Sequence, residues 1–554
     1  MDRIARPFPL SASRFAAFRM SRPSLLRSML SFSGGTFVSR LLGLVREQAI
    51  AYAFGANAAT DAFWVAFRIP NFLRRLFAEG SFSVAFVPVL TEVKETRAHA
   101  DLKELVARTA GTLGAVLLVV TALGVLGAPW IARGFAPGSI DEPDKFALTT
   151  DLLRVTFPFL LFVSLTALAG GVLNSFHRFL LPALTPVILN LCMIAGALWA
   201  APHFDVPIMA LGWAIFAAGV LQLLLQLPAL RRLDLLAVPR WGWRHPDVRR
   251  ILRLMVPTLF GSSVAQVNLL LDTLIASFLI AGSQTWLAQT DRLLEFPLGL
   301  FGVALGTVIL PSLSRHHVAT DRDGFARALD WGLRMALLIA VPAMLALMLL
   351  ARPILATLLQ HGRFTAHDVE MAALSLSALS FGLPAFALVK VVAPAFYARQ
   401  DTRTPVRAGI VAMIANMVLN LLFVGLLFQL WHRPEHLGDG WLAAVAKVPG
   451  LHMGLALASA LASYLNLAQL WLALKRDGVY VPQPGWARHL VRLAVACAAM
   501  VAVIGAALWQ WPDWGGWSVS TRIVRLGFVV AAAGAAFLAT LFACGFRLRE
   551  LRAH

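Results

Sequence analysis

The sequence predicts an all-α polytopic membrane protein with about 14 transmembrane helices, arranged as two parallel-repeat six-helix lobes around a central cavity plus two extra C-terminal helices. Three observations predict it. The 554-residue chain is 59% hydrophobic and only 14% charged, whereas a soluble domain carries about 25% charged residues. Apolar runs long enough to cross a bilayer recur along the chain. Sequence motifs also recur after 221 to 223 residues, as from Pro88 to Pro311.

The predicted helices follow one another with short polar connections, and each is close to or above the roughly 20 residues that cross a hydrocarbon core. The first, second and eighth carry charged residues in their interiors, and the others are more uniformly apolar. In chain order we expect helices over residues 31–55, 61–92, 106–132, 148–174, 181–201, 207–230, 251–281, 286–313, 328–351, 368–398, 405–430, 450–474, 488–510 and 520–545.

Basic loops alternate with loops poor in Lys and Arg. Residues 94–108, 231–253, 315–334 and 475–492 are basic, whereas the intervening loops are not. Under the positive-inside rule this places both termini in the cytoplasm. The rule also accounts for the net charge of +19, so we predict no nucleic-acid partner.

The repeat divides the chain. Because each copy has six helices, both copies enter the membrane from the same side, and the substrate site is expected between them. We predict a basic cytoplasmic N-terminal tail at 1–28, an N-lobe at 29–232, a basic cytoplasmic linker at 233–250, a C-lobe at 251–476, and a segment at 477–554 with helices thirteen and fourteen and the C-terminus.

Charged residues inside the first, second and eighth helices predict a cationic cavity. An Arg at the centre of a membrane helix costs about 2.5 to 3.5 kcal/mol, and such residues persist where they face water or a charged partner. A cationic cavity in turn predicts an anionic substrate. Each segment has an alternative interpretation. The arginines of the first helix could extend from a helix end to the membrane surface, and the second segment could be a cytoplasmic loop with amphipathic helices. The charges of the eighth helix could neutralise one another. The residues concerned are Ser39, Arg40, Arg46, Glu47, Asp61, Arg68, Arg74, Arg75, Glu79, Asp291, Arg292 and Glu295.

A second group combines Asp272, in an apolar segment, with Asn416 and Asn420, which share one helix face. A carboxylate and amide oxygens could bind a monovalent cation such as sodium. The alternative is hydrogen bonding between helices. No other cofactor is indicated. The chain lacks a Walker A motif, His-Glu-x-x-His and Gly-x-Ser-x-Gly, so we predict a transporter and not an enzyme.

Several motifs resemble those of the MurJ (MviN) family, the lipid II flippases of the MOP exporter superfamily. They are Ser39-Arg-Leu-Leu-Gly-Leu-Val-Arg46, Thr60-Asp-Ala-Phe63, Pro70-Asn-Phe-Leu-Arg-Arg75, Ala78-Glu-Gly-Ser-Phe82, Asp291-Arg-Leu-Leu-Glu-Phe-Pro297 and Tyr397-Ala-Arg-Gln-Asp401. The resemblance implies a multi-pass protein of the bacterial inner membrane that works by alternating access. It would transport lipid II, undecaprenyl-diphosphate-linked MurNAc-pentapeptide-GlcNAc, from the cytoplasmic to the periplasmic leaflet.

By the same resemblance, Arg40, Arg46, Arg74 and Arg292 are the cavity arginines, with Ser39, Glu47 and Asp61 as polar companions. Arg75, Glu79, Asp291 and Glu295 are supporting residues. Asp272, Asn416 and Asn420 fall where some members hold sodium, although some members carry Asp where this chain has Asn420. Partners would be lipid II, membrane lipids, and the cell-wall synthesis or division machinery.

Two other transport functions remain open. One is a flippase for another polyprenyl-diphosphate-linked saccharide, which the charges hardly distinguish from a lipid II flippase. The other is a MATE-like multidrug exporter, which would need an acidic cavity for its cationic substrates.

Overall fold

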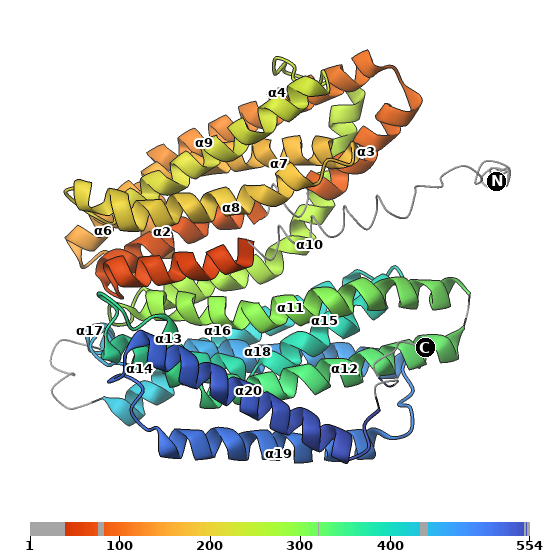
Figure 1. Cartoon of the computed structure of the whole chain (residues 1–554). Coiled ribbons are helices and arrows are strands. Elements are labelled where there is room, and N and C mark those ends of the chain that lie inside the picture. Colours follow the sequence, from red (N-terminus) through yellow and green to blue (C-terminus); the bar gives the residue numbers. More distant parts are fainter. Residues whose placement is uncertain (1–38, 76–81, 320, 433–440, 548–549, 551–554) are drawn as a thin grey trace.

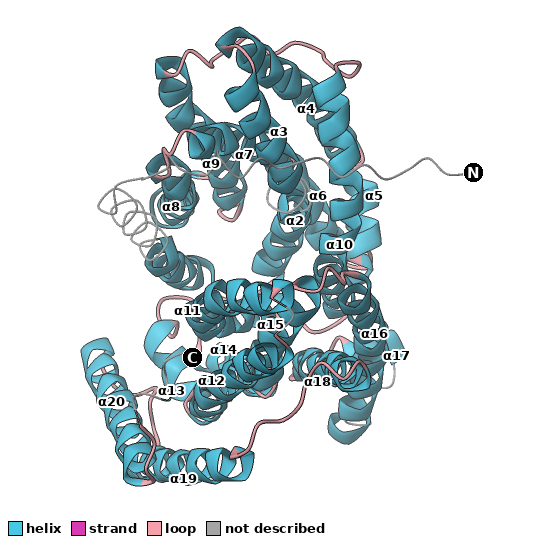
Figure 2. Cartoon of the chain, turned by 90° about the vertical axis from the view of Figure 1, so that its right-hand side faces the viewer, coloured by secondary structure: helices cyan, strands magenta, loops and turns pink. Residues whose placement is uncertain are grey.

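The computed structural model describes residues 39–75, 82–319, 321–432, 441–547 and 550, and within these ranges it contains helices and loops but no strand (Figures 1 and 2). Residues 39–54 are helical. The rest of the N-lobe consists of α2 (Ala58–Arg74), α3 (Ser83–Thr96), α4 (His99–Leu126), α5 (Ala128–Phe135), α6 (Pro143–Thr156), α7 (Phe159–Ser175), α8 (Leu180–Ala195) and α9 (Met209–Arg232).

The C-lobe follows a linker that lies against α4, where the Arg240 amide donates to the Ala107 carbonyl at 3.0 Å. Its helices are α10 (Pro246–Ala276), α11 (Ser283–Val318), α12 (Arg322–Leu349), α13 (Ala351–Leu358), α14 (Ala366–Ser380), α15 (Leu383–Tyr397), α16 (Arg403–Trp431), α17 (Trp441–Val445) and α18 (His452–Arg476). Two further helices, α19 (Trp486–Gln510) and α20 (Val519–Ala543), pack on each other and lie on the side of the C-lobe remote from the N-lobe (Figure 2).

The predicted fold class is confirmed. Ten helical segments of the described chain are long and apolar enough to cross a membrane, and each coincides with a predicted span. The other four predicted spans, which include all three with interior arginines, are also helical where described. Predicted span 148–174 is bent between α6 and α7, next to Pro158, because proline has no amide hydrogen to donate. Span 368–398 is bent at Gly382, between α14 and α15.

The structure repeats itself at the spacing of the sequence motifs. His177 and Gln400, 223 residues apart, both adopt left-handed backbone conformations, with φ of 58° and 62°. Each lies in the same turn, closed by an amide-to-carbonyl bond from Arg178 to Leu173 at 2.9 Å and from Asp401 to Phe396 at 3.0 Å. The first residues of α5 and α13, and of α6 and α14, are also 223 positions apart.

The two lobes contact each other at one end of the molecule, which we call the closed end, and their ribbons diverge toward α3 and α12 (Figure 1). At the closed end the Gly138 amide donates to Ser277 Oγ at 3.1 Å, and the Arg363 amide donates to the Tyr52 carbonyl at 3.0 Å. Gly362 has a φ of 59°, and a Cβ there would lie 2.3 Å from that carbonyl. This close approach therefore requires glycine.

Candidate functional site

A cavity of about 770 Å³ lies between the lobes. The helix at 39–54, α2 and α8 supply its N-lobe wall. On the C-lobe side α11 supplies most of the wall, and α12, α13 and α15 add a few residues. Six cationic side chains and two carboxylates line it, which gives a formal charge of +4. The charged and polar lining residues are Ser39, Arg40, Arg46, Glu47, Asn71, Arg74, Arg75, Asn190, Gln289, Arg292, Glu295 and Lys390.

Glu47 connects the two lobes inside this cavity. Its side chain is only 3% exposed and forms an ion pair with its neighbour Arg46. From α11, Gln289 donates to Glu47 at 3.3 Å, and Arg292 Nε lies 3.5 Å from its Oε1. Arg292 also pairs with Glu295 at 3.0 Å and remains 33% exposed. A buried carboxylate thus holds two arginines from different lobes close together, which their mutual repulsion would otherwise oppose.

The arginines on the N-lobe wall of the cavity make further contacts. Arg46 donates to Asn190 Oδ1 at 3.0 Å, and Asn190 donates to the Ser39 carbonyl at 2.9 Å. Arg74 donates to Asn71 at 3.0 Å. The guanidinium of Arg40 lies directly over Gly299 of α11, where a Cβ would be 2.0 Å from its terminal nitrogen. Gly299 therefore leaves room for an arginine of the opposite lobe.

A smaller cavity of about 370 Å³ adjoins the first and shares Asn71, Arg75, Arg292 and Glu295 with it. It contains three arginines, counting Arg68, and three carboxylates, so it is formally neutral. Arg68 is buried, donates to Thr273 at 2.7 Å and lies 3.6 Å from Asp291. Asp291 therefore pairs with Arg68 of the N-lobe, and Arg292 pairs with Glu47 of the N-lobe as well as with Glu295 of α11. A triplet that neutralises itself within α11 would not include these N-lobe partners.

Asp61 lies outside both cavities, at the closed end, in contrast to its expected role beside the substrate. Its carboxylate accepts hydrogen bonds from the amides of Gly282 and Thr285, at 2.7 and 2.9 Å, and from the Thr285 hydroxyl at 2.7 Å. The first N–H groups of a helix have no partner within the helix and attract a carboxylate. Asp61 accepts hydrogen bonds from two such groups at the start of α11, across the contact between the lobes. Glu79 lies outside the described residues.

The predicted Asp272 group does come together. Asp272 Oδ1 accepts from Asn420 at 2.7 Å and from Asn416 at 3.3 Å, and Oδ2 accepts from Ser459 at 3.3 Å. Asn268 contributes a further amide, 3.5 Å from Oδ2. The amide oxygens of Asn416 and Asn420 are buried and have no hydrogen-bond partner among the described residues. Hard oxygen donors of this kind suit a small monovalent or divalent cation.

A model of the family described as "Lipid II flippase MurJ" matches residues 50–431, more than half of the chain. The chain belongs to the MurJ family. The lipid II flippase MurJ of Burkholderia cenocepacia is 42% identical over 539 residues, covering 96% of this chain and 99% of that protein. The probable lipid II flippase MurJ of Vibrio cholerae is 44% identical over 539 residues, covering 96% and 98%.

Solved structures agree with this membership in the MurJ family. A lipid II flippase MurJ in an inward closed conformation superimposes with a TM-score of 0.72 at 26% identity, covering 92% of this chain and 99% of that one. An inward-facing MATE multidrug transporter of the MOP superfamily superimposes with a TM-score of 0.61 at 13% identity, covering 80% and 95%, which shows a shared fold only. A MurJ-family chain is a multi-span inner-membrane transporter and not an enzyme.

Several cavity residues of this MurJ-family chain were not among the predicted site residues. Lys390 is the single charged residue of α15 and donates to the Leu298 carbonyl at 3.3 Å. Asn190 and Gln289 are uncharged and so carry little signal in a hydropathy reading. A lone lysine within an apolar helix is a detectable signal, and the prediction overlooked it.

Proposed function

We propose that this chain transports lipid II from the cytoplasmic to the periplasmic leaflet by alternating access, with the diphosphate held by the cavity arginines. The main support is the +4 cavity between two lobes that meet at one end, in a chain of the MurJ family. The relatives named as lipid II flippases cover nearly the whole chain. Both termini would be cytoplasmic, so that the closed end faces the periplasm.

The charge of the cavity suits a diphosphate. A diphosphate carries about two negative charges, and arginine guanidinium groups bind phosphate oxygens through paired hydrogen bonds. Glu47 and Glu295 compete with the substrate for Arg292, which keeps binding reversible. The neutral adjoining cavity offers polar groups and the aromatic residues Trp64 and Phe67 to the sugars. The lipid tail would remain in the bilayer beside α19 and α20.

Movement of the substrate outward would follow opening of the closed end. The lobes are connected there by the Asp61 hydrogen bonds and two backbone contacts, which can break without unfolding either lobe. With the cell interior negative, outward movement of an anion is favoured by about 2.3 kcal/mol per charge per 100 mV. The membrane potential can therefore favour export.

The cavity charge disfavours the multidrug alternative, because a cationic drug would be repelled by a net charge of +4. A flippase for another polyprenyl-diphosphate saccharide has the same electrostatic requirement, and the names of the relatives are what favour lipid II.

Depletion of the protein from its bacterium tests the proposal. We expect lipid II to accumulate in the cytoplasmic leaflet, since synthesis continues while transport stops, and wild-type protein to restore its distribution. Leaflet-specific cleavage or labelling of the pyrophosphate-linked saccharide measures this. An unchanged lipid II distribution, with another saccharide-linked lipid retained inside instead, would support the other flippase.

We further propose that the Asp272 group binds sodium. The support is the cluster of the Asp272 carboxylate with a hydroxyl and two side-chain amides, whose nitrogens donate to it. The oxygens of the same two amides are buried and lack partners among the described residues. An amide can rotate to present its oxygen to a cation, and the cation would then offset the cost of burying the carboxylate. Sodium bound here would link α10, α16 and α18 and so stabilise the C-lobe.

A sodium titration at constant ionic strength checks this. Purified wild-type protein should show a rising Tm as sodium replaces choline, and Asp272→Asn should remove the rise because a neutral amide binds a cation weakly. Asp291→Asn, the same change in the same cavity, should retain the sodium response. A flat titration of wild-type protein would instead indicate hydrogen bonding between helices alone.

A further inference from the structure

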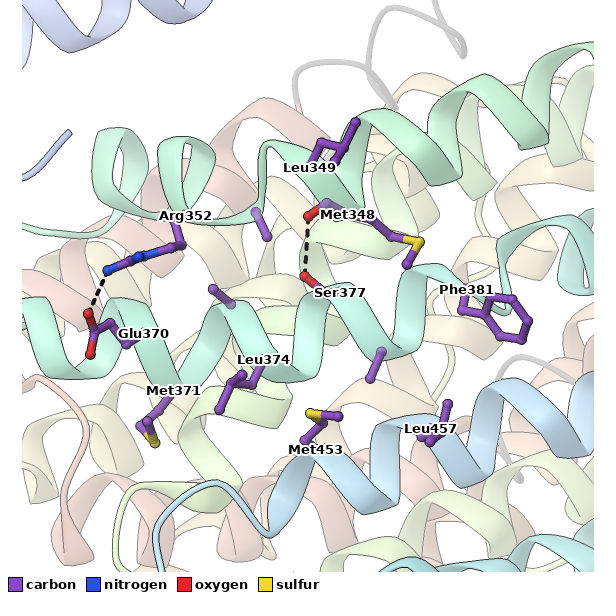
Figure 3. Close-up of a pocket in the computed structure, with 13 residues that line it drawn as sticks. Met348, Leu349, Arg352, Glu370, Met371, Leu374, Ser377, Phe381, Met453 and Leu457 are labelled. Atoms are coloured by element: carbon purple, nitrogen blue, oxygen red, sulfur yellow. Dashed lines mark hydrogen bonds and ion pairs between the residues drawn. The ribbon is translucent and has the colours of Figure 1, made fainter. Parts of the chain in front are cut away.

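An apolar groove of about 800 Å³ lies on the C-lobe (Figure 3) and shares no lining residue with the central cavity. The end of α12 and the start of α13 form one side, α18 forms the other, and α14 forms the floor. Ten of its thirteen lining residues are apolar. The lining residues that matter below are Arg352, Glu370, Leu374, Ser377, Phe381 and Leu457.

The dimensions of the groove match one lipid chain. It follows α14 from Glu370 to Phe381, a rise of about 16 Å at 1.5 Å per residue. This is about half of the roughly 30 Å hydrocarbon core, the depth of a single leaflet. The hydroxyl of Ser377 donates to the Met348 carbonyl at 3.3 Å, so this polar side chain within the groove needs no hydrogen bond from an occupant. Met348, Met371 and Met453 are flexible enough to fit a lipid chain closely.

One end of the groove carries a pair of opposite charges. Arg352 and Glu370 form an ion pair of 2.5 Å, and their side chains are 67% and 52% exposed (Figure 3). Arg352 lies near the start of α13 and Glu370 near the start of α14, and the segment between these helices contains Arg363, which contacts Tyr52 at the closed end. The charged mouth therefore lies toward a membrane surface and the apolar part extends toward the bilayer centre.

The internal repeat shows that this groove is a departure from the common plan. At the 223-residue spacing, Leu374 and Ser377 correspond to Asp151 and Arg154 of α6, which form an exposed ion pair of 3.0 Å with each other. Arg352 and Glu370 correspond to Pro129 and Ala147. The C-lobe thus has apolar groove residues where the N-lobe has an ion pair, and a charged pair where the N-lobe has Pro129 and Ala147.

We infer that the groove binds one zwitterionic phospholipid, with an acyl chain along α14, its phosphate at Arg352 and its ammonium group at Glu370. Opposite charges a few ångströms apart complement a headgroup that carries phosphate and ammonium together, whereas an anionic headgroup would meet Glu370 unfavourably. The lipid fills a surface that the C-lobe leaves open and joins α12, α13, α14 and α18. This site is independent of lipid II transport.

Lipid-stripped, purified full-length protein tests the inference. Phosphatidylethanolamine and phosphatidylglycerol with identical acyl chains are added, and bound lipid is counted by native mass spectrometry alongside Tm. We expect wild-type protein to prefer phosphatidylethanolamine, and Arg352→Gln or Glu370→Gln to weaken that binding about twofold to fivefold. Glu370→Arg should reverse the preference toward phosphatidylglycerol, because two cations then face the headgroup.

Leu374→Trp should fill the groove and remove the bound lipid without affecting the charged mouth. Arg154→Gln, the same loss of an exposed ion pair at a repeat-related position, should change neither preference nor Tm response. Equal retention of both lipids by wild-type protein and all variants would overturn the inference. So would a dimer in light scattering that Leu374→Trp converts to monomer, because the groove would then bind a second copy.

Discussion

Arg292→Ala should reduce lipid II transport by at least about 30-fold while leaving the protein folded and inserted. Arg292 is the cavity arginine of the C-lobe, it is partly exposed to the cavity, and it reaches Glu47 of the N-lobe. Removing the guanidinium that binds the diphosphate breaks a charged contact, which costs about 2 to 5 kcal/mol. A loss of about 2 kcal/mol lowers an equilibrium constant about 30-fold. Transport is measured by complementation of a depleted strain and by leaflet-specific assay of lipid II.

Two variants make this result specific. Arg292→Lys keeps the charge but loses the planar guanidinium, which can donate two parallel hydrogen bonds to a phosphate. It should therefore retain only part of the wild-type activity if the diphosphate is bound through such paired hydrogen bonds. Arg315→Ala removes an exposed arginine near the end of the same helix and should be nearly silent. Full complementation by Arg292→Ala would exclude this residue from the binding site.

Asp61→Ala should shift the protein away from the conformation with its closed end shut. The carboxylate satisfies two amides and a hydroxyl of α11 that are otherwise buried in the closed state. Once it is removed, those groups regain partners only when the lobes separate and water enters. A change of about 2 to 5 kcal/mol alters the ratio of open to closed molecules by about 30- to 4,000-fold.

Electron paramagnetic resonance distances between spin labels on Asp141 and His367, exposed residues of opposite lobes, would measure this shift. Asp61→Asn retains one acceptor oxygen and should have a smaller effect. Thr285→Val loses only the hydroxyl bond and should have the smallest. An unchanged distance distribution in Asp61→Ala would show that the backbone contacts alone keep this end closed.

The sequence alone was sufficient for the helices and for most of the cavity. Apolar length predicts membrane helices because the bilayer leaves few other ways to satisfy backbone hydrogen bonds. Arginines in such helices must face water or an opposite charge, which predicts a cationic cavity from the residues alone. The choice of Arg40, Arg46, Arg74 and Arg292 as its arginines came from the family resemblance, and all four line the cavity between the lobes. The match of Pro88 with Pro311 predicted the 223-residue spacing that the turns at His177 and Gln400 show. The match of Arg178 with Arg399, which are 221 residues apart, was two residues out of register, because Arg178 occupies the position of Asp401 in these turns.

Tertiary structure decided which polar residue does what. Asp61 opens one predicted helix and Glu47 lies inside another, and no signal in the sequence separates their roles. In the structure Asp61 caps α11 at the closed end, whereas Glu47 binds two arginines inside the cavity. Lys390 and Asn190 join the site through helices with little other polar character. The lipid groove at Arg352 and Glu370 exists because α12, α14 and α18 meet at that place. Hydropathy and periodicity depend on neighbours along one helix, whereas these roles depend on neighbours from other helices, which a single sequence does not specify.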